Sequence, residues 1–139
     1  MIKKLSVNDK DKFYELGSLI NNNFINLYDL ELLCDSVYDF LYGYYDNNIL
    51  IGFIHVTKIY ESMDIVNIVV DVKYRRCGVA SKLIDYAYLQ FNDLEKILLE
   101  VNVNNKSAIS LYEKNGFSVI DVRKKYYGQD DALIMMKEV

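Results

Sequence analysis

The order of apolar and polar residues predicts seven strands and four helices along the chain. Strands are predicted by runs of residues that are all apolar, or that alternate between apolar and polar, and that are bounded by Asn, Asp and Gly. Such runs cover residues 2–6, 37–46, 49–56, 64–72, 97–103, 117–127 and 132–138. Apolar residues at every third or fourth position predict helices over residues 7–20, 29–35, 79–92 and 106–114.

The strands over residues 64–72 and 97–103 are apolar at nearly every position, as in strands that are covered on both faces. A helix joins them, so we expect a parallel pair with a right-handed crossover. Hairpins flank this pair. The chain therefore predicts one α/β domain over residues 1–139 (α+β in stricter usage), with a mixed, curved central sheet.

Composition excludes several classes of protein. The chain has 139 residues, of which 52% are hydrophobic and 26% charged, and this balance is typical of a globular domain. A net charge of −4 argues against direct nucleic-acid binding. Neither an apolar leader nor a membrane-length apolar run is present, and Cys34 and Cys77 lie too far apart for a metal knuckle. We expect a cytoplasmic protein, monomeric or weakly dimeric, without metal or membrane contact.

The first segment with candidate chemistry is residues 70–81, which runs from a strand end into a helix start. Backbone N–H groups at a helix N-terminus attract anions, and Gly78 and Ala80 would let a phosphate approach them closely. Arg75 and Arg76 add positive charge. A pyrophosphate suits this loop, although a plain turn with a surface basic pair fits the same residues.

The second segment contains Glu100, which interrupts an apolar strand and shares a face with Leu98 and Asn102. A carboxylate at such a place is costly unless it is paired or lines a cleft. Desolvation would raise the pKa of Glu100 and make it a general base near neutral pH. The alternative is a structural ion pair or a solvated strand end.

The third segment is a short helix over residues 106–114, with Asn105 as its expected N-cap and Gly116 as its C-terminal stop. Tyr112 lies one turn after Ala108 on the packed side, where a core role is the ordinary interpretation. His55, the single histidine, is interpreted as a strand residue with a satisfied hydrogen bond rather than a catalyst.

Together the three segments resemble the GNAT superfamily of acetyl-CoA-dependent N-acetyltransferases, whose pyrophosphate loop reads Arg/Gln-x-x-Gly-x-Gly/Ala, here Arg75-x-x-Gly78-x-Ala80. Residues 64–137 look more specifically like RimI-type enzymes, which acetylate the N-terminal amine of a ribosomal protein. The matching pieces are Asn67-Ile68-Val69-Val70-Asp71, Leu99-Glu100-Val101, Asn105-x-x-Ala108, Leu111-Tyr112-Glu113, Asn115-Gly116-Phe117, Arg123-Lys124-Lys125-Tyr126-Tyr127 and Asp131-Ala132-Leu133-Ile134-Met135.

The resemblance implies a role for each matching residue. Two parallel strands splay apart in this family, and the pantetheine of acetyl-CoA pairs with strand backbone in the gap. Glu100 matches the general base and Tyr112 the general acid that protonates the departing thiolate. The residues that would contact acetyl-CoA through backbone or side chain are Ile68, Val69, Val70, Arg76, Cys77, Gly78, Val79, Ala80, Ser81 and Asn105.

The departures from the family pattern lie where the acceptor would bind. Asn102 stands where RimI-type enzymes have Arg, residues 23–29 lack the usual Pro-Trp, and the loop over residues 128–130 is shortened. Three hypotheses follow. The first is acetylation of a protein N-terminus, most narrowly the N-terminal Ala of a ribosomal protein. The others are acetylation of a lysine or small-molecule amine, and binding of CoA without turnover.

Overall fold

The computed structural model describes the backbone of residues 1–139 and the side chains of residues 1–125 and 128–139. The strands are β1 (Ile2–Lys4), β2 (Asp39–Asp46), β3 (Ile49–Ile59), β4 (Ser62–Val70), β5 (Lys96–Asn102), β6 (Ser118–Tyr127) and β7 (Asp130–Glu138). The helices are α1 (Lys10–Gly17), α2 (Phe24–Leu27), α3 (Leu30–Asp35), α4 (Val79–Leu89) and α5 (Lys106–Lys114), and the 3₁₀ turns are η1 (Val7–Asp9) and η2 (Val72–Tyr74).

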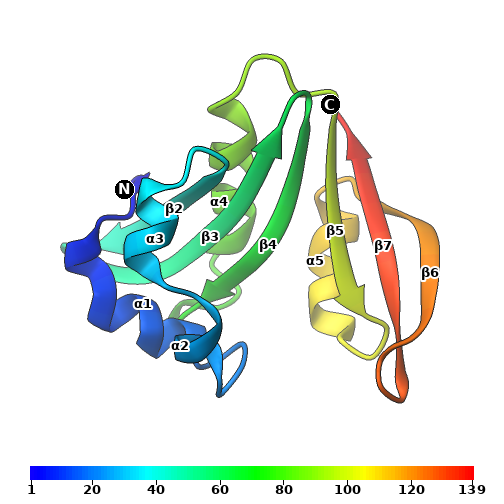
Figure 1. The fold of residues 1–139 in the computed structure, drawn as a ribbon, viewed down its shortest axis with the longest axis horizontal. Coiled ribbons are helices and arrows are strands. Elements are labelled where there is room, and N and C mark those ends of the chain that lie inside the picture. The colour runs from blue at the N-terminus through cyan, green and yellow to red at the C-terminus, as the bar shows by residue number, and fades with distance from the viewer.

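All seven strands form one mixed sheet in the order β1-β2-β3-β4-β5-β7-β6. β4 and β5 are parallel, and every other neighbouring pair is antiparallel. This arrangement confirms the predicted mixed sheet with a helix-linked parallel pair, because α4 connects β4 to β5 (Figure 1). The predicted β-hairpins also form, as β2–β3 and β6–β7.

Helices cover the two faces of the sheet in separate groups. On one face, α1, α2 and α3 pack against β2 and β3 around Phe13, Phe24 and Phe53, which are all fully buried. On the other face, α4 packs through Leu83 and Ile84 against the remaining core. Figure 1 shows α1 to α3 and α4 on opposite sides of β3 and β4, with α5 beside β5.

The pairing of β4 with β5 is short. Their register runs over residues 62–65 of β4 and 96–99 of β5 and then ends. β4 continues alongside β3 to Val70, whereas β5 continues alongside β7 to Asn102. The two strands therefore diverge from a shared start, as Figure 1 shows, and their facing edges carry no ladder between them beyond Ile65 and Leu99.

The N-terminal helix is shorter than its apolar pattern predicts. The spacing of Leu19 and Ile20 continues the helical period, yet α1 ends at Gly17, and Leu19 and Ile20 are exposed. Tertiary packing explains the difference. The ring of Phe24, at the start of the unpredicted helix α2, lies where a side chain on residue 17 would stand, so the chain turns back over Gly17.

The Gly17–Phe24 contact generates a stability prediction. In Gly17→Ala the new Cβ overlaps the Phe24 ring, which is 1% exposed and packed against Phe13 and Phe53. Overpacking of this kind costs about 1–3 kcal/mol, which exceeds the gain of roughly 1 kcal/mol in helix propensity. Urea denaturation should show a lower free energy of unfolding than wild type.

Glu15→Ala is the matched control, because Glu15 lies on the exposed side of the same helix and its carboxylate forms a surface ion pair with Lys12. It should change the free energy of unfolding by about 0.5 kcal/mol or less. Equal stability of Gly17→Ala and wild type would contradict the packing argument.

Candidate active site

The loop between β4 and α4 has the geometry of an anion-binding turn. Gly78 is the N-cap of α4 with φ of +79°, and no side chain caps the helix there. The first intrahelical bond runs from Lys82 N–H to the Gly78 carbonyl at 3.0 Å, so the amides of residues 79–81 precede the helical ladder. Arg76 also has a positive φ, of +64°, which is uncommon for a side-chain-bearing residue.

Side chains around this loop hold it in place rather than fill it. Arg75 Nε donates to the Val70 carbonyl at 3.2 Å, which ties the loop back to the end of β4. Asn115, at the end of α5, donates from Nδ2 to Ser81 Oγ at 3.1 Å. The sequence analysis missed this bond, because the two residues are 34 positions apart and no short motif contains both.

Asn105 caps α5 as predicted, since its Oδ1 accepts the Ala108 N–H at 3.2 Å. The backbone of Ile68, Val69 and Val70 lies on β4 beyond the last pairing with β5. The residues predicted to contact acetyl-CoA occupy three places, namely the parted edge of β4, the turn into α4 and the start of α5. Their roles stay predictions.

The structure distinguishes between the two interpretations of Glu100. This residue lies on the face of β5 opposite the buried Leu99 and Val101, and 32% of its side chain is exposed. Its Oε1 forms an ion pair with Arg123 Nη1 at 2.8 Å. The alternative interpretation, a structural ion pair, is thus present in the structure. Arg123 comes from β6, and only the register of β5, β7 and β6 brings it there.

Glu100 also has an acidic neighbour on β4. Burial and the negative charge of Glu100 raise the pKa of Asp64, while Lys96 opposes the shift. Asp64 is level with Leu98 in the parallel register, two residues before Glu100. The two carboxylates stand on the same face of the sheet, one on each of the parting strands.

Tyr112 lies on the other face of β5. It is 7% exposed, belongs to the core cluster that contains Leu99 and Val101, and meets the ring of Phe117 edge-on at 5.8 Å between centroids. Glu100 and Tyr112 therefore approach β5 from opposite faces. The predicted base and the predicted acid thus lie on opposite faces of the same strand.

Asn102 is engaged by its own loop. Its Nδ2 donates to Asp130 Oδ2 at 3.2 Å, and its Oδ1 accepts the Asn104 N–H at 2.8 Å. The shortened loop over residues 128–130 is thereby tied to the end of β5. The side chains of Tyr126 and Tyr127, in the tail that carries part of the resemblance, lie outside the described residues.

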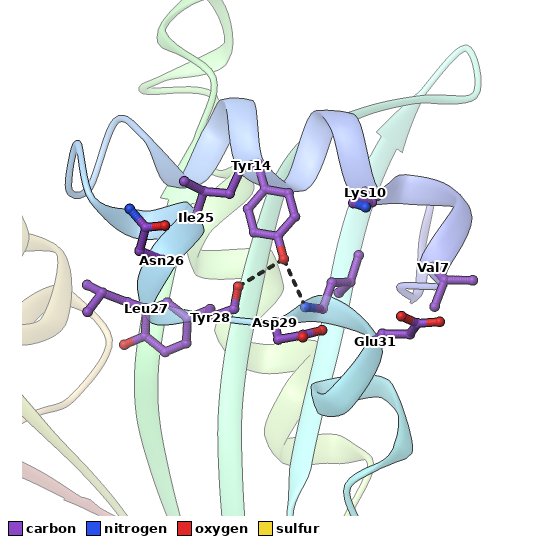
Figure 2. Close-up of a pocket in the computed structure, with 10 residues that line it drawn as sticks. Val7, Lys10, Tyr14, Ile25, Asn26, Leu27, Tyr28, Asp29 and Glu31 are labelled. Carbon is purple, nitrogen blue, oxygen red and sulfur yellow. Dashed lines mark hydrogen bonds between the residues drawn. The ribbon is translucent and has the colours of Figure 1, made fainter.

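The α1–α3 region also contains a hollow of about 600 Å³ (Figure 2). The Tyr14 hydroxyl donates to the Tyr28 carbonyl at 2.9 Å and accepts the Leu30 N–H at 3.1 Å, which fixes the loop between α2 and α3. None of the predicted catalytic or acetyl-CoA residues lines this hollow.

The described residues contain no cluster of three or more His, Cys, Asp or Glu side chains that could hold a metal ion. Within the same residues, no helix has the length and apolarity needed to cross a membrane.

The fold and the parted strands define an acyltransferase of a known class. The family model "Acetyltransferase (GNAT) family" matches residues 10–117, so the chain belongs to this family. The protein is accordingly an acetyl-CoA-dependent N-acetyltransferase, with acetyl-CoA as its co-substrate. The resemblance drawn from the sequence is confirmed.

Curated relatives are N-terminal acetyltransferases by name. The chain is 28% identical to the [Ribosomal protein bS18]-alanine N-acetyltransferase of Haemophilus influenzae, over 97% of this chain and 96% of that protein. It is 33% identical to the Escherichia coli K12 enzyme of the same name, over 64% of each chain. It is 42% identical to an N-alpha-acetyltransferase of Saccharolobus solfataricus, over 52% of this chain and 46% of that protein.

Solved structures share the fold. The PaiA N-acetyltransferase of Thermoplasma acidophilum in complex with coenzyme A superimposes with a TM-score of 0.85 at 22% identity, covering 100% of this chain and 98% of that chain. The ribosomal-protein-S18-alanine N-acetyltransferase of Escherichia coli gives a TM-score of 0.81 at 22% identity, covering 100% and 93%.

The turn into α4 generates a binding prediction. Gly78→Ala places a Cβ at a φ of +79° and into the space in front of the first-turn amides, where nothing of the protein lies within 4 Å. The dissociation constant for CoA should rise about 10-fold, or roughly 1.4 kcal/mol, as measured by isothermal titration calorimetry.

Gly128→Ala is the matched control, because Gly128 has a φ of +70° and equally open space, but lies in the turn after β6. It carries the same backbone strain and should leave CoA affinity within about two-fold of wild type. Equal affinities of the two variants would contradict the assignment of the α4 turn to the cofactor.

Proposed function

We propose that this enzyme transfers the acetyl group of acetyl-CoA directly to the N-terminal α-amine of a protein, and most narrowly to the N-terminal Ala of a ribosomal protein. The observation that carries the proposal is the opening between β4 and β5, with Glu100 on one face of β5 and Tyr112 on the other. The names of the bacterial and archaeal relatives support the same class of acceptor.

Glu100 serves as the proton acceptor in this proposal, acting through a water molecule. An α-amine has a pKa near 8, about two units below that of a lysine side chain, so its deprotonation at neutral pH costs little. Arg123 contacts Oε1 of Glu100. In the proposal, the other oxygen of Glu100, Oε2, accepts the proton.

The new C–N bond forms as the neutral amine nitrogen attacks the thioester carbonyl, a proton from that nitrogen passes through the water molecule to Glu100, and the C–S bond then breaks. An amide of Ile68, Val69 or Val70 donates to the carbonyl oxygen as negative charge develops on it, which requires no rearrangement of the strand. Tyr112 donates its phenolic proton to the departing thiolate from the α4–α5 face of the sheet. This step uses no covalent enzyme intermediate.

A lysine or small-molecule amine is the second candidate acceptor, and one observation favours it. Asn102 stands where the resemblance leads us to expect Arg, and both ends of its amide are bound to Asp130 and Asn104. A feature that RimI-type enzymes share is thus replaced by a contact within the loop.

Two catalytic variants test the roles of Glu100 and Tyr112. Glu100→Gln and Tyr112→Phe should each lower kcat about 100-fold on a peptide that begins with Ala and lacks Lys, because each removes one proton-transfer group. Mass spectrometry follows the gain of one acetyl group, about 42 Da, per peptide. Tyr42→Phe is the matched control, because Tyr42 is buried in the same core cluster as Tyr112.

A second peptide, with a blocked N-terminus and several Lys, distinguishes the two acceptors. Acetylation of the Ala peptide alone supports the α-amine proposal. Acetylation of the Lys peptide alone, by an enzyme that binds acetyl-CoA, overturns it in favour of the second candidate. Full activity of Glu100→Gln would instead overturn the assignment of the base and leave the acceptor class standing.

A further inference from the structure

Two polar atoms next to the opening between β4 and β5 lack hydrogen-bond partners. Among the side-chain nitrogen and oxygen atoms that the structure describes, two enclosed atoms have no hydrogen-bond partner. Both are nitrogens, His55 Nδ1 and Asn67 Nδ2. They belong to directly opposed residues of β3 and β4. An enclosed polar atom without a partner costs about 1–3 kcal/mol, so two neighbouring ones require a physical explanation.

The chemistry of His55 shows what its Nδ1 can do. The ring is 3% exposed, and its Nε2 lies 2.6 Å from Asp39 Oδ1. The other oxygen of Asp39 accepts the Ser36 hydroxyl at 2.7 Å. Because a carboxylate only accepts, Nε2 carries the proton. Burial lowers the pKa of His55, although Asp39 opposes this shift, so the ring is neutral and Nδ1 is an acceptor.

Asn67 Nδ2 is a donor, and its residue lies directly opposite His55 in the β3–β4 register. The two partnerless atoms are therefore complementary in their hydrogen-bonding chemistry. In the reverse orientation of the amide, Asn67 Oδ1 would be directed to His55 Nδ1, and both are acceptors. The His55 tautomer therefore selects one orientation of Asn67. With Nδ2 directed to His55, the amide oxygen is directed away from it.

The position of Asn67 connects this pair to the reaction. β4 pairs with β5 only as far as Ile65, and Asn67 lies two residues beyond, at a bulge in the β3–β4 ladder. It immediately precedes Ile68, the first residue whose backbone we assign to acetyl-CoA. Asn67 is half-buried.

Asn67 also lies on the same face as the proposed base. The neighbours of His55 along β3, Ile54 and Val56, belong to the core on the α4 face, so His55 points to the α1–α3 face, where the Tyr28 ring meets it at 5.8 Å. Its cross-strand partner Asn67 shares that face. Glu100 stands on this face of β5 because Leu99 and Val101 point to the other.

We propose that Asn67 Oδ1 accepts a hydrogen bond from the attacking α-amine, and that His55, oriented by Asp39, is the positioning residue that holds the Asn67 amide in place. A neutral primary amine has two N–H groups and one lone pair. With one N–H directed to Asn67 and the other to the water that leads to Glu100, the lone pair faces the thioester carbonyl. This inference rests on the proposed function.

Steady-state kinetics on the Ala peptide test the inference. Asn67→Ala should lower kcat/KM for the peptide about 10-fold and leave the dissociation constant for CoA within two-fold, because the backbone of β4 is unchanged. His55→Leu should lower kcat/KM by a similar factor. His55→Gln should stay within about three-fold of wild type, since a Gln amide can donate to Asp39 and accept from Asn67.

The double variant Asn67→Ala/His55→Leu separates positioning from a general structural effect. If His55 acts through Asn67, the double variant should lose no more activity than Asn67→Ala alone. Losses that multiply would overturn the positioning role. His55→Leu leaves Asp39 Oδ1 without its partner. If this variant does not fold, Asn67→Ala and His55→Gln decide alone. Unchanged peptide kinetics in Asn67→Ala overturn the inference.

The wild-type enzyme distinguishes this inference from the proposed function. If it binds CoA and leaves the Ala peptide unmodified, the proposed function fails and the inference fails with it. If it acetylates the peptide and Asn67→Ala does so equally well, only the inference fails.

Discussion

The parallel pairing of β4 with β5 stops after Ile65 and Leu99, and each strand then stays with its other neighbour. The backbone N–H and C=O groups along the parted edges need hydrogen-bond partners, so burying these edges without partners would be unfavourable. A ligand that itself carries amides can supply the partners. Pantetheine is such a ligand. The same parting places the strand ends beside the uncapped N-terminus of α4, which favours the negative charge of a pyrophosphate.

The core makes this parting possible. The cluster on the α4 face spans both halves of the sheet, because it includes Val70 from β4, Val101 from β5 and Tyr112 from α5. Side chains on that face therefore hold the two strand ends together after their hydrogen-bond ladder has ended. The Asn115–Ser81 bond links the C-terminal end of α5 to the first turn of α4 and adds a polar connection on the same side.

Local patterns in the sequence predicted the helices, the strands and the turn into α4, because these features depend on residues that are neighbours in the chain. The seven strands, the crossover helix and the Asn105 cap were all predicted from periodicity and capping rules. Contacts between distant residues were not. Arg123 reaches Glu100 only through the register of three strands, so the sequence left open whether Glu100 is desolvated or ion-paired, and the structure shows an ion pair with 32% of the Glu100 side chain exposed. The short helix α2 depends likewise on how Phe24 packs over Gly17.

The placement of charge around the opening suits two substrates of opposite sign. Arg75 and Arg76 lie in the turn into α4, whose amides add partial positive charge where the phosphates of acetyl-CoA would bind. Asp64 on β4 and Glu100 on β5 stand one on each of the parting strands, close enough that Glu100 raises the pKa of Asp64. An α-ammonium group is attracted to such a pair before it loses its proton. Because the basic turn and the acidic pair lie at different places along the parting strands, the proposed function places the phosphates of acetyl-CoA at the turn and the amine at the carboxylates.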